Sequence, residues 1–196
     1  MQRNMRDLMT SGLTHSIAEY CEIRIEETEE TSVRFRGKDI ELVSQNISVG
    51  GNVRVLYKGA WGFVSFNRLD DLAKKVEEAC AQATILGDRL NKDIRLYPVD
   101  PVVDYVQGGF KREAFAVPLK DKMELLEGYN ELILASPEIT SSSVYYMDKH
   151  THWHFANSDG TYIYQEKMDL GGQAHRPGVS QIRVKSGLQC GIRPGR

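Results

Sequence analysis

An alternation of apolar and polar residues over 20–66 constrains the fold of this chain more than any other sequence feature. Cys21, Ile23 and Ile25 alternate with charged neighbours, and the two-residue period returns over 33–35, 40–44, 53–57 and 61–66. Because successive strand side chains point to opposite faces of a sheet, this period predicts half-buried strands. Turns are predicted at 26–31, 37–38 and 58–59, and a break at 50–51. Strands joined in succession by short turns form a largely antiparallel sheet.

An amphipathic helix is predicted directly after these strands. Asn67 is the predicted N-cap, Asp70 and Asp71 suit the positive end of the helix dipole, and Gly87 is the predicted end. Apolar and small residues recur between them at spacings of three and four, at Leu69, Leu72, Ala73, Val76, Ala79, Cys80 and Ala83. Such a stripe covers one face of a sheet. The predicted fold class is therefore α+β, a largely antiparallel sheet with helices packed on one face.

The remaining segments carry weaker patterns. Residues 3–16 and 119–134 predict helices, 88–117 predicts an extended connector, and 142–155 with 161–167 predicts a hairpin around the Asn157–Gly160 turn. The segment 171–196 holds many glycines and five basic residues but no acidic one, and it is predicted to be irregular apart from a short strand within 179–184. The predicted organisation is one domain over 1–170 and a basic tail over 171–196.

Composition narrows the function classes. The 196 residues carry a formal net charge of -2, which argues against a dedicated nucleic-acid binder. No run approaches the roughly 20 apolar residues of a membrane helix, and the polar start is unlike a secretory signal. Cys21, Cys80 and Cys190 form no Cys-x-x-Cys pair. We therefore expect a cytoplasmic protein with reduced thiols that serve as core residues rather than nucleophiles, and no membrane partner.

His150, His152 and His154 are the most suggestive residues for chemistry, because residues two apart share one face of a strand. Neighbouring members lie about 7 Å apart along such a strand, so one tetrahedral ion cannot take all three. Two of them with a distant partner, or simply a polar sheet face, remain open. The sequence contains no histidine followed by glutamate, no Gly-x-Ser-x-Gly and no phosphate-binding loop. We therefore assign no catalytic residue and no metal ligand.

The run Gly50–Asn67 (Gly-Gly-Asn-Val-Arg-Val-Leu-Tyr-Lys-Gly-Ala-Trp-Gly-Phe-Val-Ser-Phe-Asn) is followed by Leu-Asp-Asp-Leu and an alanine-rich helix pattern. It resembles the N-terminal domain of the TldD/PmbA metallopeptidases, and the TldD-like branch in particular. Residues 20–27 and 33–41 also match, and Phe155–Thr161 resembles the hairpin turn of the family. The resemblance covers roughly 20–169 and ends where the basic tail begins, which suggests a truncated or frameshifted protein.

The resemblance implies a cytoplasmic zinc peptidase of unfolded or small peptides that works as a homodimer or as a TldD/PmbA-type heterodimer. Some members are described as modulators of DNA gyrase, and some mature peptide antibiotics. The zinc motif of the family is His-Glu-x-x-x-His on a helix, and this chain contains none of it. Zinc is thus implied for the full-length family, whereas no cofactor is expected on this chain.

Three functions remain open. The first is an N-terminal domain that forms part of the peptide chamber and of the dimer surface, with an edge strand at 51–57 or 60–66 near the peptide. Trp61 and Phe63 would then be substrate contacts or packing anchors. The second is a non-catalytic binding or regulatory module that pairs with a full-length relative. The third is a nucleic-acid partner that acts through the basic tail.

Overall fold

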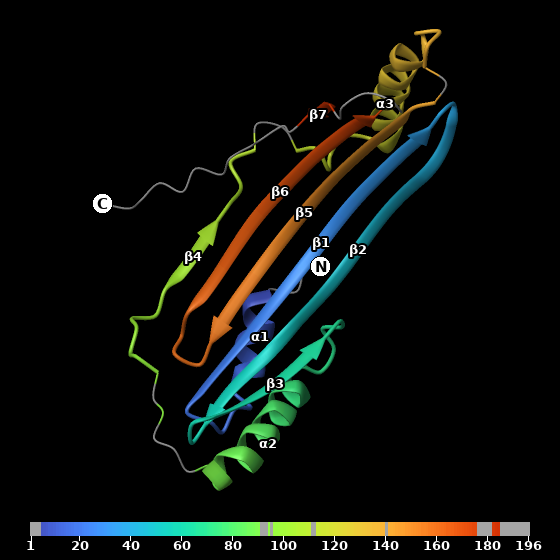
Figure 1. Cartoon of the computed structure of the whole chain (residues 1–196). Coiled ribbons are helices and arrows are strands. Elements are labelled where there is room, and N and C mark those ends of the chain that lie inside the picture. The colour runs from blue at the N-terminus through green and yellow to red at the C-terminus, as the bar shows by residue number, and fades with distance from the viewer. Residues whose placement is uncertain are drawn as a thin grey trace. The chain divides into compact units, whose positions relative to one another are not determined.

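The computed structural model describes residues 5–90, 94, 96–110, 113–139, 141–175 and 182–184 (Figure 1). Its helices are α1 (Met5–Leu13), α2 (Leu72–Leu90) and α3 (Leu119–Leu134). Its strands are β1 (Tyr20–Arg36), β2 (Asp39–Tyr57), β3 (Ala60–Phe66), β4 (Val103–Val106), β5 (Ser143–Asn157), β6 (Tyr162–His175) and β7 (Ile182–Val184). Among these helices, none is both long and apolar enough to span a bilayer.

The strands form one sheet in the order β3-β2-β1-β5-β6-β4, with β7 paired to β6. The β2–β3 and β6–β7 pairs are antiparallel, whereas β4 runs parallel to β6. The predicted fold class, α+β with a largely antiparallel sheet, is therefore confirmed. The chain divides into two compact units, which are described separately: unit 1 comprises Met1–Glu27, Ser48–Gln107 and His152–Glu166, and unit 2 comprises Thr28–Ile47, Gly108–Thr151 and Lys167–Arg196.

The core of unit 1 follows from the two-residue alternation of its strands and from the spacing of three and four residues in α2. The odd-numbered residues of β1 and alternate residues of β2 turn toward the helices, and the apolar stripe of α2 meets them together with Met9 of α1. The fully buried members are Met9, Cys21, Ile23, Val53, Val55, Val76, Ala79 and Ala83. Burying a side chain of valine or isoleucine size contributes about 1.5–3 kcal/mol. Both helices of unit 1 therefore pack into one core on one face of its strands, as the sequence predicts.

The predicted ends of α2 are wrong at both sides. The helix begins at Leu72, and the Asp71 Oδ1 atom accepts a hydrogen bond from the Lys74 backbone N–H at 3.4 Å, so Asp71 rather than Asn67 occupies the N-cap position. The helix also continues through Gly87 to Leu90. A Cβ at Gly87 would collide with the carbonyl oxygen of Tyr57, so this glycine permits a close approach of backbones instead of ending the helix.

The predicted turn at 26–31 and the predicted break at 50–51 are also wrong, because β1 continues through 26–31 and β2 continues through 50–51. Gly51 lies inside β2, and a Cβ at this position would collide with the carbonyl oxygen of Arg24 and the ring of Phe66. Its role is close packing and not a turn. The turns at 37–38, 58–59 and 157–160 are confirmed, and Gly37, Gly59 and Gly160 have φ of 58°, 77° and 94° there.

Unit 2 has its own small core, in which Leu126 of α3 packs with Val33, Phe35 and Val144. The predicted helix at 119–134 is confirmed. A buried ion pair joins the Lys122 Nζ atom to the Asp148 Oδ2 atom at 2.6 Å. The predicted connector contains β4, and β6 continues through 171–175, while 182–184 pair with β6. The rest of the predicted basic tail lies outside the described residues, and the predicted boundary at residue 170 stays a prediction.

Candidate functional site

Strand β3 presents Trp61 and Phe63, two of its three large aromatic residues, on the face away from α2. Ala60 and Gly62 are buried, and a Cβ at Gly62 would collide with the backbone of Ala79 in α2, so this face of β3 lies directly against the helix. Because strand side chains alternate, Trp61 and Phe63 lie on the opposite face. They are 37% and 53% exposed, and neither belongs to the buried core. The two residues named as substrate contacts therefore lie on an open surface of unit 1.

A row of stacked side chains crosses this open face from β3 to β5. The Arg54 guanidinium lies 4.5 Å from the centroid of the Trp61 ring, and the Arg24 guanidinium lies 4.9 Å from that of Phe155. Tyr20 meets Trp61 edge to face, with ring centroids 6.2 Å apart. An exposed guanidinium on an aromatic ring contributes about 0.5–1 kcal/mol. These contacts hold both arginine side chains against aromatic rings of the open face.

Glu22 organises the centre of the row. Its side chain is only 6% exposed, and its Oε1 atom lies 3.3 Å from Arg24 Nε and 3.2 Å from Arg54 Nη1. The Tyr20 hydroxyl donates a hydrogen bond of 2.8 Å to the other carboxylate oxygen. Burial, together with this bond to Glu22, raises the pKa of Tyr20 to about 12. One carboxylate thus serves two guanidiniums, which leaves positive charge on the row beside Trp61.

An edge of the sheet lies along β3, since β3 is the terminal strand of the order and, among the described strands, pairs with β2 alone over Gly51–Tyr57. The Phe63 backbone N–H points away from β2 and donates to the Gln82 side-chain oxygen at 3.2 Å. In an antiparallel ladder alternate residues point outward, so the main-chain groups of Trp61 and Ser65 point to the same side. Main-chain groups of β3 therefore line this outer edge, and Gln82 binds one of its donors.

The histidine residues of unit 1 lie on its helix-facing side. The His154 Nδ1 atom is 3.0 Å from the Tyr162 hydroxyl, and its Nε2 atom is 3.3 Å from Glu27 Oε2. Burial lowers the pKa of His154, although the Glu27 carboxylate opposes the shift. The His152 Nδ1 atom lies 2.7 Å from the Tyr164 hydroxyl. Since both ring nitrogens of His154 already have partners, this residue does not fit the role of a zinc ligand.

The third member of the histidine run lies in unit 2. His150 contacts the rings of Phe110 and Phe115 there, with ring centroids 6.1 Å and 6.0 Å apart. His150 thus takes part in aromatic packing in unit 2, and His152 and His154 take part in tyrosine hydrogen bonds in unit 1. No chemical role is assigned to it.

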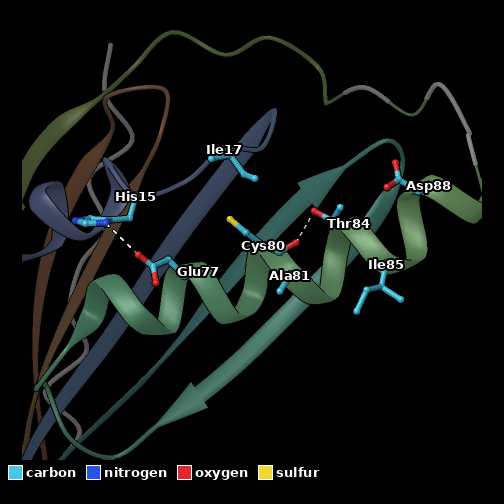
Figure 2. A pocket seen from close by; sticks show the side chains of 8 residues that line it. All are labelled: His15, Ile17, Glu77, Cys80, Ala81, Thr84, Ile85 and Asp88. Carbon is cyan, nitrogen blue, oxygen red and sulfur yellow. Dashed lines mark hydrogen bonds and ion pairs between the residues drawn. The ribbon is translucent and has the colours of Figure 1, made fainter.

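A groove of about 450 Å³ runs between α2 and the segment 15–17 (Figure 2). His15 and Glu77 lie at one end, with His15 Nδ1 3.4 Å from the carboxylate, and Ile17 and Ile85 border the groove. The Cys80 sulfur is 3.8 Å from the Ser16 hydroxyl and is 5% exposed. A nucleophilic thiol needs a base within hydrogen-bond reach, which this contact does not supply.

The other described thiol is Cys21, which is fully buried in the core of unit 1. Burial raises its pKa to about 12, so it stays protonated at neutral pH. The prediction that Cys21 and Cys80 are core residues is thus confirmed, and Cys190 lies outside the described residues.

Residues 21–83, which include β3 and the residues Glu22, Arg24, Arg54 and Gln82, match the model of the PmbA/TldA metallopeptidase domain 1. A metalloprotease from Synechocystis is 36% identical over 161 residues, which are 81% of this chain and 34% of that protein. The chain contains a first domain of the PmbA/TldD metallopeptidase family. A metalloprotease from Methanocaldococcus jannaschii is 29% identical over 150 residues, 75% of this chain and 33% of the relative. The chain thus spans about a third of the length of these curated relatives.

Solved structures show the same fold. A suggested modulator of a DNA gyrase from Thermotoga maritima aligns with a TM-score of 0.68 at 16% identity, over 91% of this chain and 41% of that chain. A second suggested gyrase modulator, from Bacteroides thetaiotaomicron, gives 0.69 at 17% identity over 92% and 44%. TldE from Thermococcus kodakarensis gives 0.53 at 15% identity over 91% and 41%. The PmbA/TldD family match and the fold therefore agree.

The sequence named Trp61 and Phe63 but missed the residues around them. Glu22 and Arg24 lie in β1 and Arg54 lies in β2. In the sequence, each looks like an ordinary exposed polar residue of an alternating strand. What brings them together is the register of β1, β2 and β3. The even-numbered alternation of β1, which is visible in the sequence, could have placed Glu22 and Arg24 on the open face.

Proposed function

We propose that this chain is the N-terminal, substrate-binding and dimer-forming domain of a TldD-type zinc metallopeptidase that cleaves unfolded or small peptides. The observation that carries the proposal is the free edge of β3 with Trp61 and Phe63 exposed beside it. The PmbA/TldD family match over 21–83 supports it, because that match includes the whole of β3.

An extended peptide can bind such an edge by adding a strand. Main-chain hydrogen bonds then supply affinity that does not depend on the peptide sequence, which suits a peptidase of unfolded chains. The Phe63 N–H would exchange its bond with Gln82 for a bond to the peptide. Trp61 and Phe63 would contact apolar side chains of the peptide, and Arg54 would attract acidic ones.

Bond cleavage is assigned to residues outside this chain, since its sequence lacks the His-Glu-x-x-x-His motif. When bound in a peptidase, zinc polarises the scissile carbonyl group and activates a water molecule. The residues of this chain would bind and orient the peptide and hold the partner subunit. Pairing with a full-length relative is part of the same proposal.

The test measures zinc content and peptide cleavage for the purified chain, alone and mixed with a full-length relative. The chain alone should bind no stoichiometric zinc and cleave nothing, and the mixture should cleave faster than the relative alone. Trp61→Ala with Phe63→Ala should remove that gain, while Tyr97→Ala, an exposed aromatic control 88% accessible, should keep it. Cleavage by the chain alone would contradict the proposal, and inhibition of the relative would favour a regulatory module instead.

A further inference from the structure

A second hollow of unit 1 lies between α1 and the turn that joins β5 to β6. Its volume is about 350 Å³, which is enough for a ligand of amino-acid to dipeptide size. Its polar lining comes from Arg6, Thr10 and Thr14 on one side, and from Asn157, Ser158 and Thr161 on the other. The first three are spaced by four residues, so they follow one face of the helix and its end.

Arg6 is the cation of this pocket. Its guanidinium lies 5.6 Å from the centroid of the Tyr162 ring, which holds the long side chain over the hollow. Among the described residues, no carboxylate forms an ion pair with Arg6. A half-buried guanidinium without an anion keeps its planar set of N–H donors for a ligand.

Two hydroxyl groups add oriented donors. The Ser158 oxygen accepts a hydrogen bond from the Cys21 backbone N–H at 3.1 Å, and the Thr161 oxygen accepts one from the Val102 N–H at 3.2 Å. Each hydroxyl therefore uses its oxygen as an acceptor of backbone bonds and keeps its hydrogen to donate. The Asn157 side chain fixes this turn by accepting from the Thr161 N–H at 2.9 Å.

We infer that this pocket binds a carboxylate group of a small ligand, such as the C-terminus of a short peptide. A planar guanidinium matches the two oxygens of a carboxylate, and the hydroxyls of Ser158 and Thr161 can complete its hydrogen bonds. Asp159 lies in the same turn, and its negative charge disfavours a doubly charged phosphate more than a carboxylate. The inference is independent of the proposed function, because no residue of this pocket belongs to β3 or to the stacked row.

The experiment titrates the full chain with three probes while the amide signals of Gly160 and Thr161 are followed by nuclear magnetic resonance. The probes are N-acetyl-alanyl-alanine, the same compound with a C-terminal amide, and inorganic phosphate. The free acid should bind at least about tenfold more tightly than the amide and more tightly than phosphate. Equal binding of acid and amide, tighter binding of phosphate, or no binding of any probe would each overturn the inference.

Variants locate the site. Arg6→Gln should weaken binding of the free acid about tenfold, and Arg6→Lys should weaken it less because the charge is kept without the planar fork. The matched control is Arg68→Gln, since Arg68 is highly exposed and pairs with Asp70. Unchanged affinity in Arg6→Gln, or an equal loss in Arg68→Gln, would contradict the assignment. Circular dichroism verifies folding, and Arg6→Lys carries the test if Arg6→Gln does not fold.

Discussion

Single residues determine how the open face of unit 1 is built, and Glu22 is the most important of them. It is almost fully buried, and it binds Arg24, Arg54 and the Tyr20 hydroxyl at once. Without the charge of Glu22, Arg24 and Arg54 would lose the anion that they share. Arg54 would then lie over Trp61 without the ion pair that holds it there. The geometry of the row therefore depends on a residue that does not itself face the solvent.

Glu22→Gln preserves the shape of this side chain but removes its charge. We expect the free energy of unfolding to fall by about 1–3 kcal/mol, because hydrogen bonds to charged groups are replaced by weaker ones in a buried position. Chemical denaturation of the full chain measures the change. The control Glu78→Gln, at an exposed position of α2, should stay within about 0.5 kcal/mol of the wild type. An equal effect of both substitutions would contradict the role given to Glu22.

His154 gives a pH dependence whose sign follows from its burial. Its pKa in the folded chain is below its ordinary value, so the unfolded chain binds the proton more readily. The contribution of neutral His154 to the free energy of unfolding is therefore fully present above about pH 6.5. It is lost as the pH falls from there through the lower pKa of His154 in the folded chain. Glu27, Tyr162, Tyr164 and His152 surround the ring, and of these only the Glu27 carboxylate opposes the loss.

The prediction is tested by measuring the free energy of unfolding between pH 7 and pH 5. His154→Gln should flatten the fall, by at most about 1.4 kcal/mol per pH unit for one proton. Asn46→Gln, which exchanges one exposed amide side chain for another, should leave the slope unchanged because neither side chain titrates. A slope that is equal in wild type and His154→Gln would show that another group is responsible.

At the scale of elements, the packing of β3 against α2 places the candidate site. The two backbones approach so closely that Gly62 has no room for a Cβ against Ala79. That contact buries one face of β3, and by alternation it turns Trp61 and Phe63 to the solvent. Gly62 thus allows the close packing of β3 on α2 that turns Trp61 and Phe63 to the open face.

Gly62→Ala should destabilise the chain by about 1–3 kcal/mol, because a backbone must move to accept the new methyl group. Gly128→Ala is the matched control: a Cβ at Gly128 meets nothing within 4 Å, and alanine is the better residue inside a helix. We expect that control to be neutral or stabilising by about 0.5–1 kcal/mol. Thermal denaturation of both variants distinguishes these results, and tolerance of Gly62→Ala would contradict the close contact.

The elements also show what the sequence could predict. Periodicity located β1 to β3, α2, α3 and the hairpin, because each buries one face against a core. It failed at Gly51 and Gly87, since a glycine that permits close packing looks the same in sequence as one that makes a turn. It also missed β4, a short strand whose four residues are all exposed and therefore lack alternation. The neighbours of Trp61 required strand register, which one sequence does not contain.

At the scale of the whole molecule, the chain is a first domain of the PmbA/TldD family that spans about a third of its curated relatives. Its proposed contribution is to hold peptides, and the family match includes the edge strand that would do so. Hydrogen bonds along that edge and the aromatic face beside it are the two physical sources of affinity in the proposal.

Hydrogen–deuterium exchange of the full chain, with and without an excess of an unfolded peptide mixture, tests this claim most directly. Backbone amides that gain a strand partner exchange more slowly. We predict that added peptide slows exchange at Trp61, Phe63 and Ser65 of β3, while amides of α3 in unit 2 keep their rates. Unchanged exchange along β3 at saturating peptide, or protection confined to other strands, would contradict the claim that this edge binds the substrate.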